Sequence, residues 1–202
     1  KKINREKEYW PAGLAKQSNY HLIGGTPENL CLVAEGYATA ATLFEATGIP
    51  VAIAFDAGNL LPVAQNLHKR YPQAKLIFCA DDDYLQKCAA CGKMTRVESS
   101  LCTHCNEPHK KSNAGIAAAS TAAFAVGGSW IAPVFSEDRG VRKLTDFNDL
   151  QQIESVAVVR AQIEAHLLDI NVRFGGVLSR DAASGGGGVS QSLKPILTDR
   201  EL

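Results

Sequence analysis

Three short apolar runs follow one another in the first half of the chain, and each ends on acidic residues. They cover residues 30–34, 51–55 and 76–80, with segments of helical length between them. Runs of about five residues rich in Val, Ile and Phe are typical of buried strands. Buried strands that alternate with helices indicate a mostly parallel sheet flanked by helices. The pattern therefore predicts a doubly wound α/β fold.

The rest of the pattern adds a fourth strand and several helices. The strand is predicted at residues 130–134, near an edge of the sheet because of Pro133. Residues 20–23 form a short extended piece before the first buried run. Helices are predicted where apolar residues recur at helical spacing or where Ala is abundant, and where capping residues mark the ends. The predicted helices span residues 37–47, 59–71, 113–126, 146–153 and 156–167.

Composition divides the chain into three parts. We expect an N-terminal extension at residues 1–27, a main domain at 28–170 and a flexible Gly-rich linker or tail at 171–202. The chain begins with Lys rather than Met and has a single Met, so we expect it to be a piece of a larger protein.

Charge and hydropathy exclude some functions. Lys and Arg together number 21, as do Asp and Glu, so the net charge is zero and gives no global signal for nucleic-acid binding. No apolar run reaches the length of a transmembrane helix, and no signal peptide opens the chain. We expect a cytoplasmic protein without a membrane partner.

Four of the six cysteines form two Cys-x2-Cys pairs, and this spacing is typical of a structural Zn²⁺ site. Free thiols or two disulfides are the alternatives. His104 and His109 lie nearby, but four thiolates complete a tetrahedron, so both should stay outside it. The segment is predicted to be a zinc-binding insertion at residues 85–109, too small to fold without a metal. The four predicted ligands are Cys88, Cys91, Cys102 and Cys105.

The acidic residues that end the three apolar runs should gather at one edge of the sheet, because ligands of such sheets bind at the carboxyl ends of the strands. Clustered carboxylates with only oxygen donors favour Mg²⁺ or Mn²⁺. The alternative is that each residue only starts a turn or caps a helix. The acidic residues concerned are Glu35, Asp56, Asp81, Asp82 and Asp83. Asp56 is a second-rank candidate, as is Asn59, which is also expected to cap the helix that follows it.

A second polar and acidic cluster, Thr-Asp-Phe-Asn-Asp, occupies residues 145–149. Leu150 and Ile153 follow in helical phase, so one interpretation is a helix cap. The other is a second-rank role for Asp146, Asn148 and Asp149 in binding a metal or a nucleotide.

The Glu-Gly-Tyr-Ala-Thr-Ala segment at residues 35–40 and the Asp triplet at 81–83 resemble the two signatures of the TOPRIM domain. Bacterial-type primases, type IA and II topoisomerases, OLD-type nucleases and RecR-type recombination mediators share this domain. The sequences of residues 35–40, 54–60 and 145–149 are similar to those of primases from phages, satellite phages and conjugative plasmids. The resemblance covers roughly residues 28–153 and implies a TOPRIM-type, Rossmann-like sheet.

Two features depart from the usual TOPRIM pattern. The middle residue of the triplet is Asp82, and the Gly that normally follows soon appears only at Gly115, after the cysteines. The zinc-binding insertion is therefore unusual for the domain, and the resemblance implies no role for it.

The resemblance implies a role for each acidic residue. Glu35 would be the general base or acid at the reacting phosphate, and Asp81 and Asp83 would hold Mg²⁺ with help from Glu35, while Asp82 would assist or face solvent. The implied activity is a DNA primase, a DNA-directed RNA polymerase and nucleotidyltransferase that makes RNA primers in mobile-element DNA replication. Its partners would be a single-stranded DNA template, ribonucleoside triphosphates and a helicase domain in the same parent chain.

Two other functions stay open at this point. One is a non-catalytic DNA-binding module of the recombination-mediator type, in which a four-cysteine zinc site precedes the TOPRIM core rather than interrupting it. The other is a nuclease with the same carboxylates, which only an assay of the reaction would separate from a primase.

Overall fold

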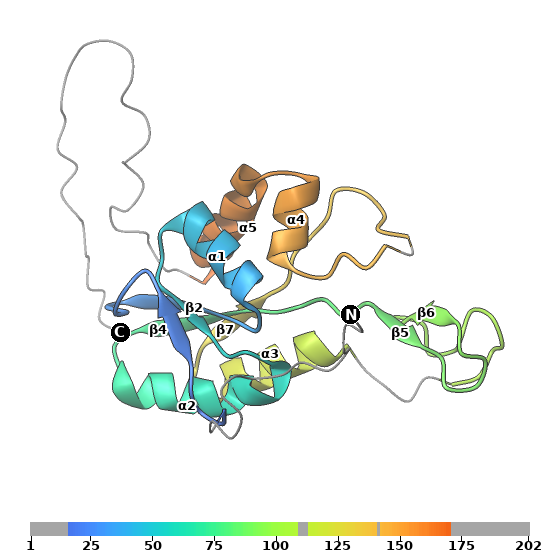
Figure 1. Ribbon diagram of the computed structural model, residues 1–202, viewed down its shortest axis with the longest axis horizontal. Coiled ribbons are helices and arrows are strands. Elements are labelled where there is room, and N and C mark those ends of the chain that lie inside the picture. Colours follow the sequence, from blue (N-terminus) through green and yellow to red (C-terminus); the bar gives the residue numbers. More distant parts are fainter. Residues whose placement is uncertain (1–15, 109–112, 141, 171–202) are drawn as a thin grey trace, which may run out of the picture.

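A computed structural model describes residues 16–108, 113–140 and 142–170 of the chain. Five strands form one sheet in the order β1-β3-β2-β4-β7 (Figure 1). Its strands are β1 (His21–Ile23), β2 (Leu30–Ala34), β3 (Val51–Ile53), β4 (Lys75–Cys79) and β7 (Ser129–Ile131). β1 runs antiparallel to β3, whereas the other three pairings are parallel. The predicted mostly parallel α/β sheet is confirmed.

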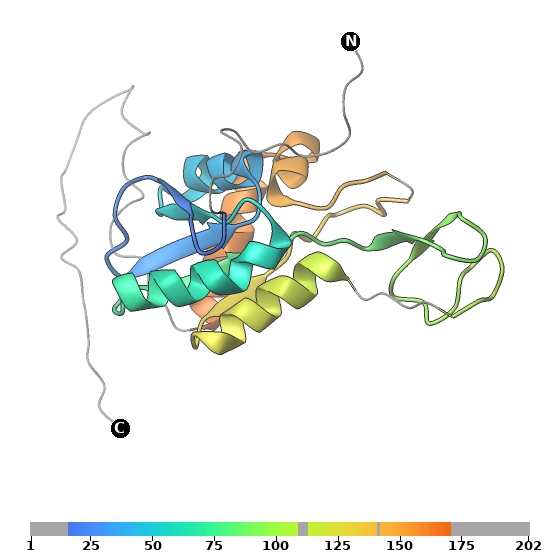
Figure 2. The same cartoon turned by 60° about the horizontal axis from the view of Figure 1, so that its bottom comes forward.

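Helices cover both faces of this sheet. On one face lie α1 (Tyr37–Thr47), α4 (Phe147–Ile153) and α5 (Val156–Asp169). On the other lie α2 (Leu60–Arg70) and α3 (Ala114–Ala125), and the two views together show these layers (Figures 1 and 2). The arrangement gives three layers, with the sheet in the middle.

The core divides by the alternation of side chains along each strand. In β2, Cys31 and Val33 pack with α2 and α3, whereas Leu32 and Ala34 pack with α1, α4 and α5. Because successive side chains of a strand point to opposite faces, a continuous apolar run serves a strand that is covered on both sides. The apolar run at residues 30–34 fits this position, because β2 lies in the middle of the sheet between β3 and β4.

The predicted elements are present, with shifted ends. β3 stops at Ile53 instead of residue 55, and Phe55 has a left-handed backbone with φ of 71°. β7 ends before Pro133 and lies at the edge of the sheet, as expected. β1 falls within the predicted N-terminal extension yet pairs with β3, so the sheet begins before residue 28.

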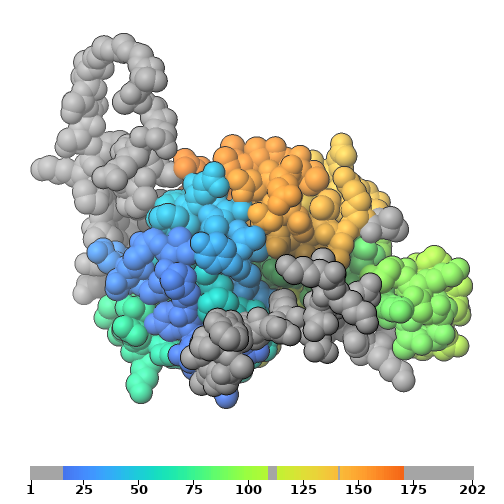
Figure 3. All heavy atoms as spheres, viewed as in Figure 1, coloured from blue at the N-terminus to red at the C-terminus, as the bar shows by residue number. Residues whose placement is uncertain are grey.

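The cysteine segment interrupts the fold between β4 and α3. It contains a hairpin of β5 (Leu85–Lys87) and β6 (Met94–Arg96), which pair antiparallel. The space-filling view shows this segment, in green, as a lobe that projects from one end of the body (Figure 3). The insertion thus leaves the sheet at the carboxyl end of β4, directly after the Asp triplet.

Some predictions lie outside the described residues. These are the structure of residues 1–15, the position of His109 and the Gly-rich tail at 171–202. Among the described helices, none has the length and apolar character needed to cross a lipid bilayer.

Candidate functional site

The parallel register of β2 and β4 brings the glutamate and the Asp triplet to one edge. Ala34 pairs with Cys79, so both strands end at the same level of the sheet. Glu35 directly follows β2, and Asp81 lies two positions after the end of β4. Both residues are half-buried. The edge predicted from the three apolar runs is therefore a real feature of the fold.

Asp82 and Asp83 are bound to neighbouring protein groups. Asp82 Oδ1 accepts a hydrogen bond from the Asn113 side chain at 2.6 Å, and Asp82 Oδ2 lies 2.6 Å from a guanidinium nitrogen of Arg139. Asp83 Oδ2 accepts the Gly115 N–H at 3.1 Å. Asp82 therefore does not face solvent, and because both of its oxygens are already occupied, Asp81 and Asp83 are the better candidates for holding a metal.

Gly115 is the residue that lets α3 begin beside Asp81. A Cβ atom at this position would lie 2.2 Å from the Asp81 carbonyl oxygen, far inside contact distance. Only glycine permits such an approach of two backbones. The glycine that follows late in the sequence thus occupies a place directly beside the Asp triplet, and the insertion separates them only along the chain.

Asn113 caps the same helix. Its Oδ1 accepts the N–H of Ile116 at 3.2 Å and that of Asp83 at 3.1 Å. One amide side chain therefore starts α3 and also fixes the backbone of the triplet.

Asp56 and Asn59 serve the structure of the turn after β3. Asp56 caps the short 3₁₀ helix Ala57–Asn59 by accepting the Asn59 N–H, and it forms an ion pair with Lys16. Asn59, predicted as a side-chain cap of α2, makes no such cap. Instead its buried amide donates to the carbonyl oxygens of Lys16, Asn19 and Ala54, so it fastens the segment before β1 to β3.

The second acidic cluster is a helix cap. Asp146 Oδ1 accepts the Asp149 N–H at 2.8 Å, and Asp149 Oδ2 accepts the Asp146 N–H at 3.4 Å, which together form a capping box at the start of α4. Asn148 Oδ1 accepts a hydrogen bond from the Thr42 hydroxyl at 3.3 Å. These contacts support the capping interpretation, and a metal or nucleotide role for Asp146, Asn148 and Asp149 stays a prediction.

The four cysteines of the insertion lie close together. Within residues 16–108, 113–140 and 142–170, they are the one group of three or more Cys, His, Asp or Glu side chains whose ligand atoms all lie within 4.8 Å of one another. The Sγ distances are 3.6 Å between Cys88 and Cys105 and 3.7 Å between Cys91 and Cys102. Tetrahedral zinc with Zn–S bonds of about 2.3 Å requires sulfur atoms about 3.8 Å apart. The cysteines therefore fit one zinc ion.

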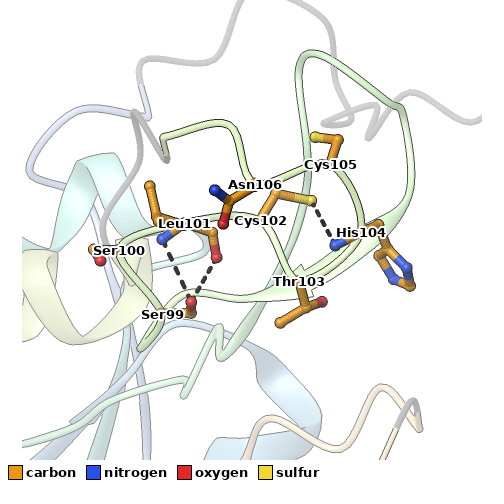
Figure 4. Close-up of a pocket in the computed structure, with 8 residues that line it drawn as sticks. All are labelled: Ser99, Ser100, Leu101, Cys102, Thr103, His104, Cys105 and Asn106. Atoms are coloured by element: carbon orange, nitrogen blue, oxygen red, sulfur yellow. Dashed lines mark hydrogen bonds between the residues drawn. The ribbon is translucent and has the colours of Figure 1, made fainter.

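The surroundings of Cys102 favour its thiolate form. The His104 N–H donates to Cys102 Sγ at 3.4 Å (dashed in Figure 4), and this contact, with the Cys105 N–H, lowers the pKa of the Cys102 thiol to about 6. Thiolates are the form that binds metal. The His104 ring points away from that sulfur, and its Nε2 lies 3.2 Å from the Met94 carbonyl oxygen. Its place outside the ligand set stays a prediction.

The same turn surrounds a hollow of about 550 Å³, lined by residues 99–106. It belongs to the zinc-binding lobe and does not involve the acidic edge, which is the edge of the sheet at which Glu35 and residues 81–83 lie.

The acidic edge has the right donors for Mg²⁺ but holds them apart. In the described part of the chain, its carboxylates do not form a group within 4.8 Å like that of the cysteines. Mg²⁺ keeps several waters in most protein sites and takes only one or two carboxylates directly. The oxygen donors of Asp81 and Asp83 are compatible with such a hydrated ion.

Sequence reasoning missed two residues that organise this edge. Arg139 was not singled out, because a lone Arg in a loop carries no pattern. Thr39 belongs to the Glu-Gly-Tyr-Ala-Thr-Ala segment, but its partner Asp146 could be found only from the fold.

Comparison with known proteins agrees with the geometry. Residues 29–98 match the protein family described as Toprim domain, a range that contains Glu35 and the Asp triplet. Two proteins named DNA primase TraC, both from Escherichia coli, are 33% and 34% identical over 125 residues, or 60% of this chain. The chain spans only 10% and 7% of their lengths. No solved structure matches significantly. The chain therefore contains a Toprim domain, at residues 29–98.

Proposed function

We propose that this chain is the catalytic Toprim domain of a DNA primase, which uses Mg²⁺ to make RNA primers on single-stranded DNA in mobile-element replication. The observation that carries the proposal is the equal register of β2 and β4, which end beside Glu35 and Asp81. The match to the Toprim family supports the same residues. The names of the two relatives supply the reaction class.

Primer synthesis needs little covalent chemistry from the protein. The 3′-hydroxyl of the growing primer attacks the α-phosphate of a ribonucleoside triphosphate, and pyrophosphate leaves. Glu35 would accept the proton of the attacking hydroxyl, while Asp81 and Asp83 would hold Mg²⁺ at the edge. When bound, Mg²⁺ would neutralise phosphate charge and lower the pKa of that hydroxyl.

The template surface would come from elsewhere in the parent protein. The chain has no net charge, and it spans a tenth or less of the relatives' lengths. We therefore expect priming to need further domains, with a helicase domain in the same parent as one candidate.

The test is primer synthesis by the full-length parent on single-stranded DNA with ribonucleotides and Mg²⁺. Glu35→Gln should abolish primers, whereas Glu45→Gln, an exposed change on α1, should leave them intact. Primers made by Glu35→Gln at the normal rate would remove the catalytic assignment. Cleavage of DNA without synthesis would favour the nuclease function instead.

Metal binding is measured separately on this chain by calorimetry with Mg²⁺. Asp81→Asn and Asp83→Asn should each weaken binding, since each removes one anionic donor. Asp169→Asn, at the exposed end of α5, is the matched control. Equal affinities in all the variants and the unchanged chain would argue against the metal site.

A further inference from the structure

Arg139 lies in the loop between β7 and α4, where it contacts two aromatic rings, a carbonyl oxygen and a carboxylate. Its guanidinium carbon lies 3.8 Å from the centroid of the Tyr84 ring and 5.0 Å from that of Phe135. Its side chain also donates to the Leu144 carbonyl oxygen at 3.0 Å and pairs with Asp82 at 2.6 Å. The side chains of Arg139 and Asp82 are only 15% and 17% exposed. An ion pair this well enclosed, with stacking on aromatic rings, holds both partners in one geometry.

The zinc-binding lobe contacts the same loop. Arg96 of β6 pairs with Asp138 at 2.5 Å, and the Val97 N–H donates to the Tyr84 carbonyl oxygen at 2.9 Å. The Tyr84 hydroxyl donates to the carbonyl oxygen of Arg142. Because the Arg96–Asp138 pair is exposed, it contributes little by itself. Tyr84 is the main link, since it is 2% exposed and lies between the lobe and Arg139.

The loop in turn holds the backbone of the Asp triplet. The Asp82 N–H donates to the Thr145 carbonyl oxygen at 2.7 Å, and the Tyr84 N–H donates to the Asp82 carbonyl oxygen at 2.7 Å. Residues 81–83 therefore touch the loop through both a side chain and the main chain. The contacts run without a break from the cysteines, through the β5–β6 hairpin and Tyr84, to Arg139 and Asp82.

We propose that Arg139 is a positioning residue that fixes residues 81–83 through Asp82, and that the zinc-binding lobe holds Arg139 in place through Tyr84. The zinc-binding lobe then influences the acidic edge without being part of it. Loss of zinc makes the carboxylates of residues 81–83 more mobile. The inference rests on the proposed function for what these carboxylates do, but the positioning itself concerns only contacts within this chain.

Hydrogen exchange of the zinc-bound chain tests the positioning. Arg139→Ala should speed exchange at the amides of Asp82 and Tyr84 by about tenfold or more, because the loop that accepts the Asp82 N–H loses its ion pair and its stacking. Arg139→Lys should restore part of the protection, since it keeps the charge but not the planar stacking. Arg142→Ala, an exposed change in the same loop, is the control. Unchanged exchange at these amides in Arg139→Ala would overturn the proposal.

Zinc removal tests the second part of the proposal, that the zinc-binding lobe holds Arg139 in place. The chain is treated with a chelator, dialysed, and checked for zinc by elemental analysis. Exchange at residues 82–84 should then rise toward the Arg139→Ala level, while amides of β2 stay protected because the core lies elsewhere. A zinc-free chain with wild-type protection at 82–84 would show that the lobe does not hold Arg139.

Binding of Mn²⁺ alone, followed by electron paramagnetic resonance, provides a readout at the edge. Arg139→Ala with its zinc retained should lower Mn²⁺ affinity by about tenfold, since a looser pair of ligands must be ordered on binding. Wild-type affinity in Arg139→Ala would contradict positioning of the metal ligands. If the unchanged chain binds no Mn²⁺, the metal part of the proposed function fails, whereas the exchange data still decide the role of Arg139.

Discussion

The Thr39 hydroxyl donates a hydrogen bond to Asp146 Oδ2 at 2.8 Å, although 107 positions separate the two residues along the chain. Thr39 lies in the first turn of α1, just after Glu35, and is 1% exposed. Asp146 caps α4, directly after Thr145, whose carbonyl oxygen accepts the Asp82 N–H. This single contact therefore connects the glutamate segment to the Asp triplet through the second acidic cluster.

Thr39→Val should destabilise the chain by about 1–2 kcal/mol, because it keeps the shape of the side chain but leaves a carboxylate oxygen without its buried donor. Denaturation by urea, followed by circular dichroism, measures the change. Thr121→Val is the matched control, since Thr121 is exposed on α3 and bonds only to its own helix. Equal stabilities of the two variants would mean that the link to Asp146 contributes nothing.

Gly115→Ala should destabilise the chain by about 1–3 kcal/mol, because the added methyl group would overlap the Asp81 carbonyl and force two backbones apart. Helix propensity alone predicts the opposite sign, a gain of about 1 kcal/mol for replacing Gly by Ala within a helix. Thermal or urea denaturation therefore decides between close approach and propensity. Ser120→Ala on the same helix should change the stability by less than about 0.5 kcal/mol, and a stabilised Gly115→Ala would refute the close approach.

The six thiols should react in two groups. The zinc-bound chain should contain one zinc per molecule, and a chelator should expose four thiols to a disulfide reagent at pH 8. Cys31 and Cys79 should stay unreactive until the chain is unfolded, because they are 0% and 3% exposed and burial raises both pKa values, that of Cys31 to about 12. Cys88→Ser should abolish stoichiometric zinc, whereas Cys31→Ser should keep it. Absence of zinc in the unchanged chain would end the assignment.

His166 should make stability depend on pH. Burial lowers its pKa from the ordinary value of 6.5, and its Nε2 lies 2.9 Å from the Ser129 hydroxyl. The folded chain therefore favours neutral imidazole, so its contribution is fully present above pH 6.5 and is lost as the pH falls through the lower folded pKa. Urea denaturation from pH 7.5 to 5 should show this loss, and His166→Gln should flatten the curve. An identical slope in both proteins would contradict the assignment.

Much of the fold could be predicted from the sequence, for a physical reason. A strand covered on both faces must be apolar at every position, so β2 and β4 were visible as uninterrupted runs. The Cys-x2-Cys spacing likewise specifies a tetrahedral site, since four thiolates from two short turns can reach one ion. In both cases the signal is local in the chain.

The contacts that shape the acidic edge are not local. Arg139 meets Asp82 across 57 positions and Asn113 meets it across 31, and no periodicity marks either residue. Asn59 illustrates the same limit: it stands where a helix cap is expected, but its amide faces three carbonyl groups that only the folded chain brings together. Which Asp residues cap a helix became visible only once their hydrogen-bond partners were known.

The start of α3 against the Asp81 backbone has a consequence for how this domain could have acquired its lobe. The Asp83 N–H lies 3.1 Å from Asn113 Oδ1, so the chain leaves the core and returns to it at nearly the same point. A segment with adjoining ends can be exchanged for a short turn, or for another small module, while β4 and α3 keep their places in the core. The zinc-binding lobe could therefore be grafted between the corresponding strand and helix of a domain that lacks it, given an Asn cap and a Gly at the point of return. To influence the acidic residues as proposed above, the graft would also need the counterparts of Tyr84 and Arg139.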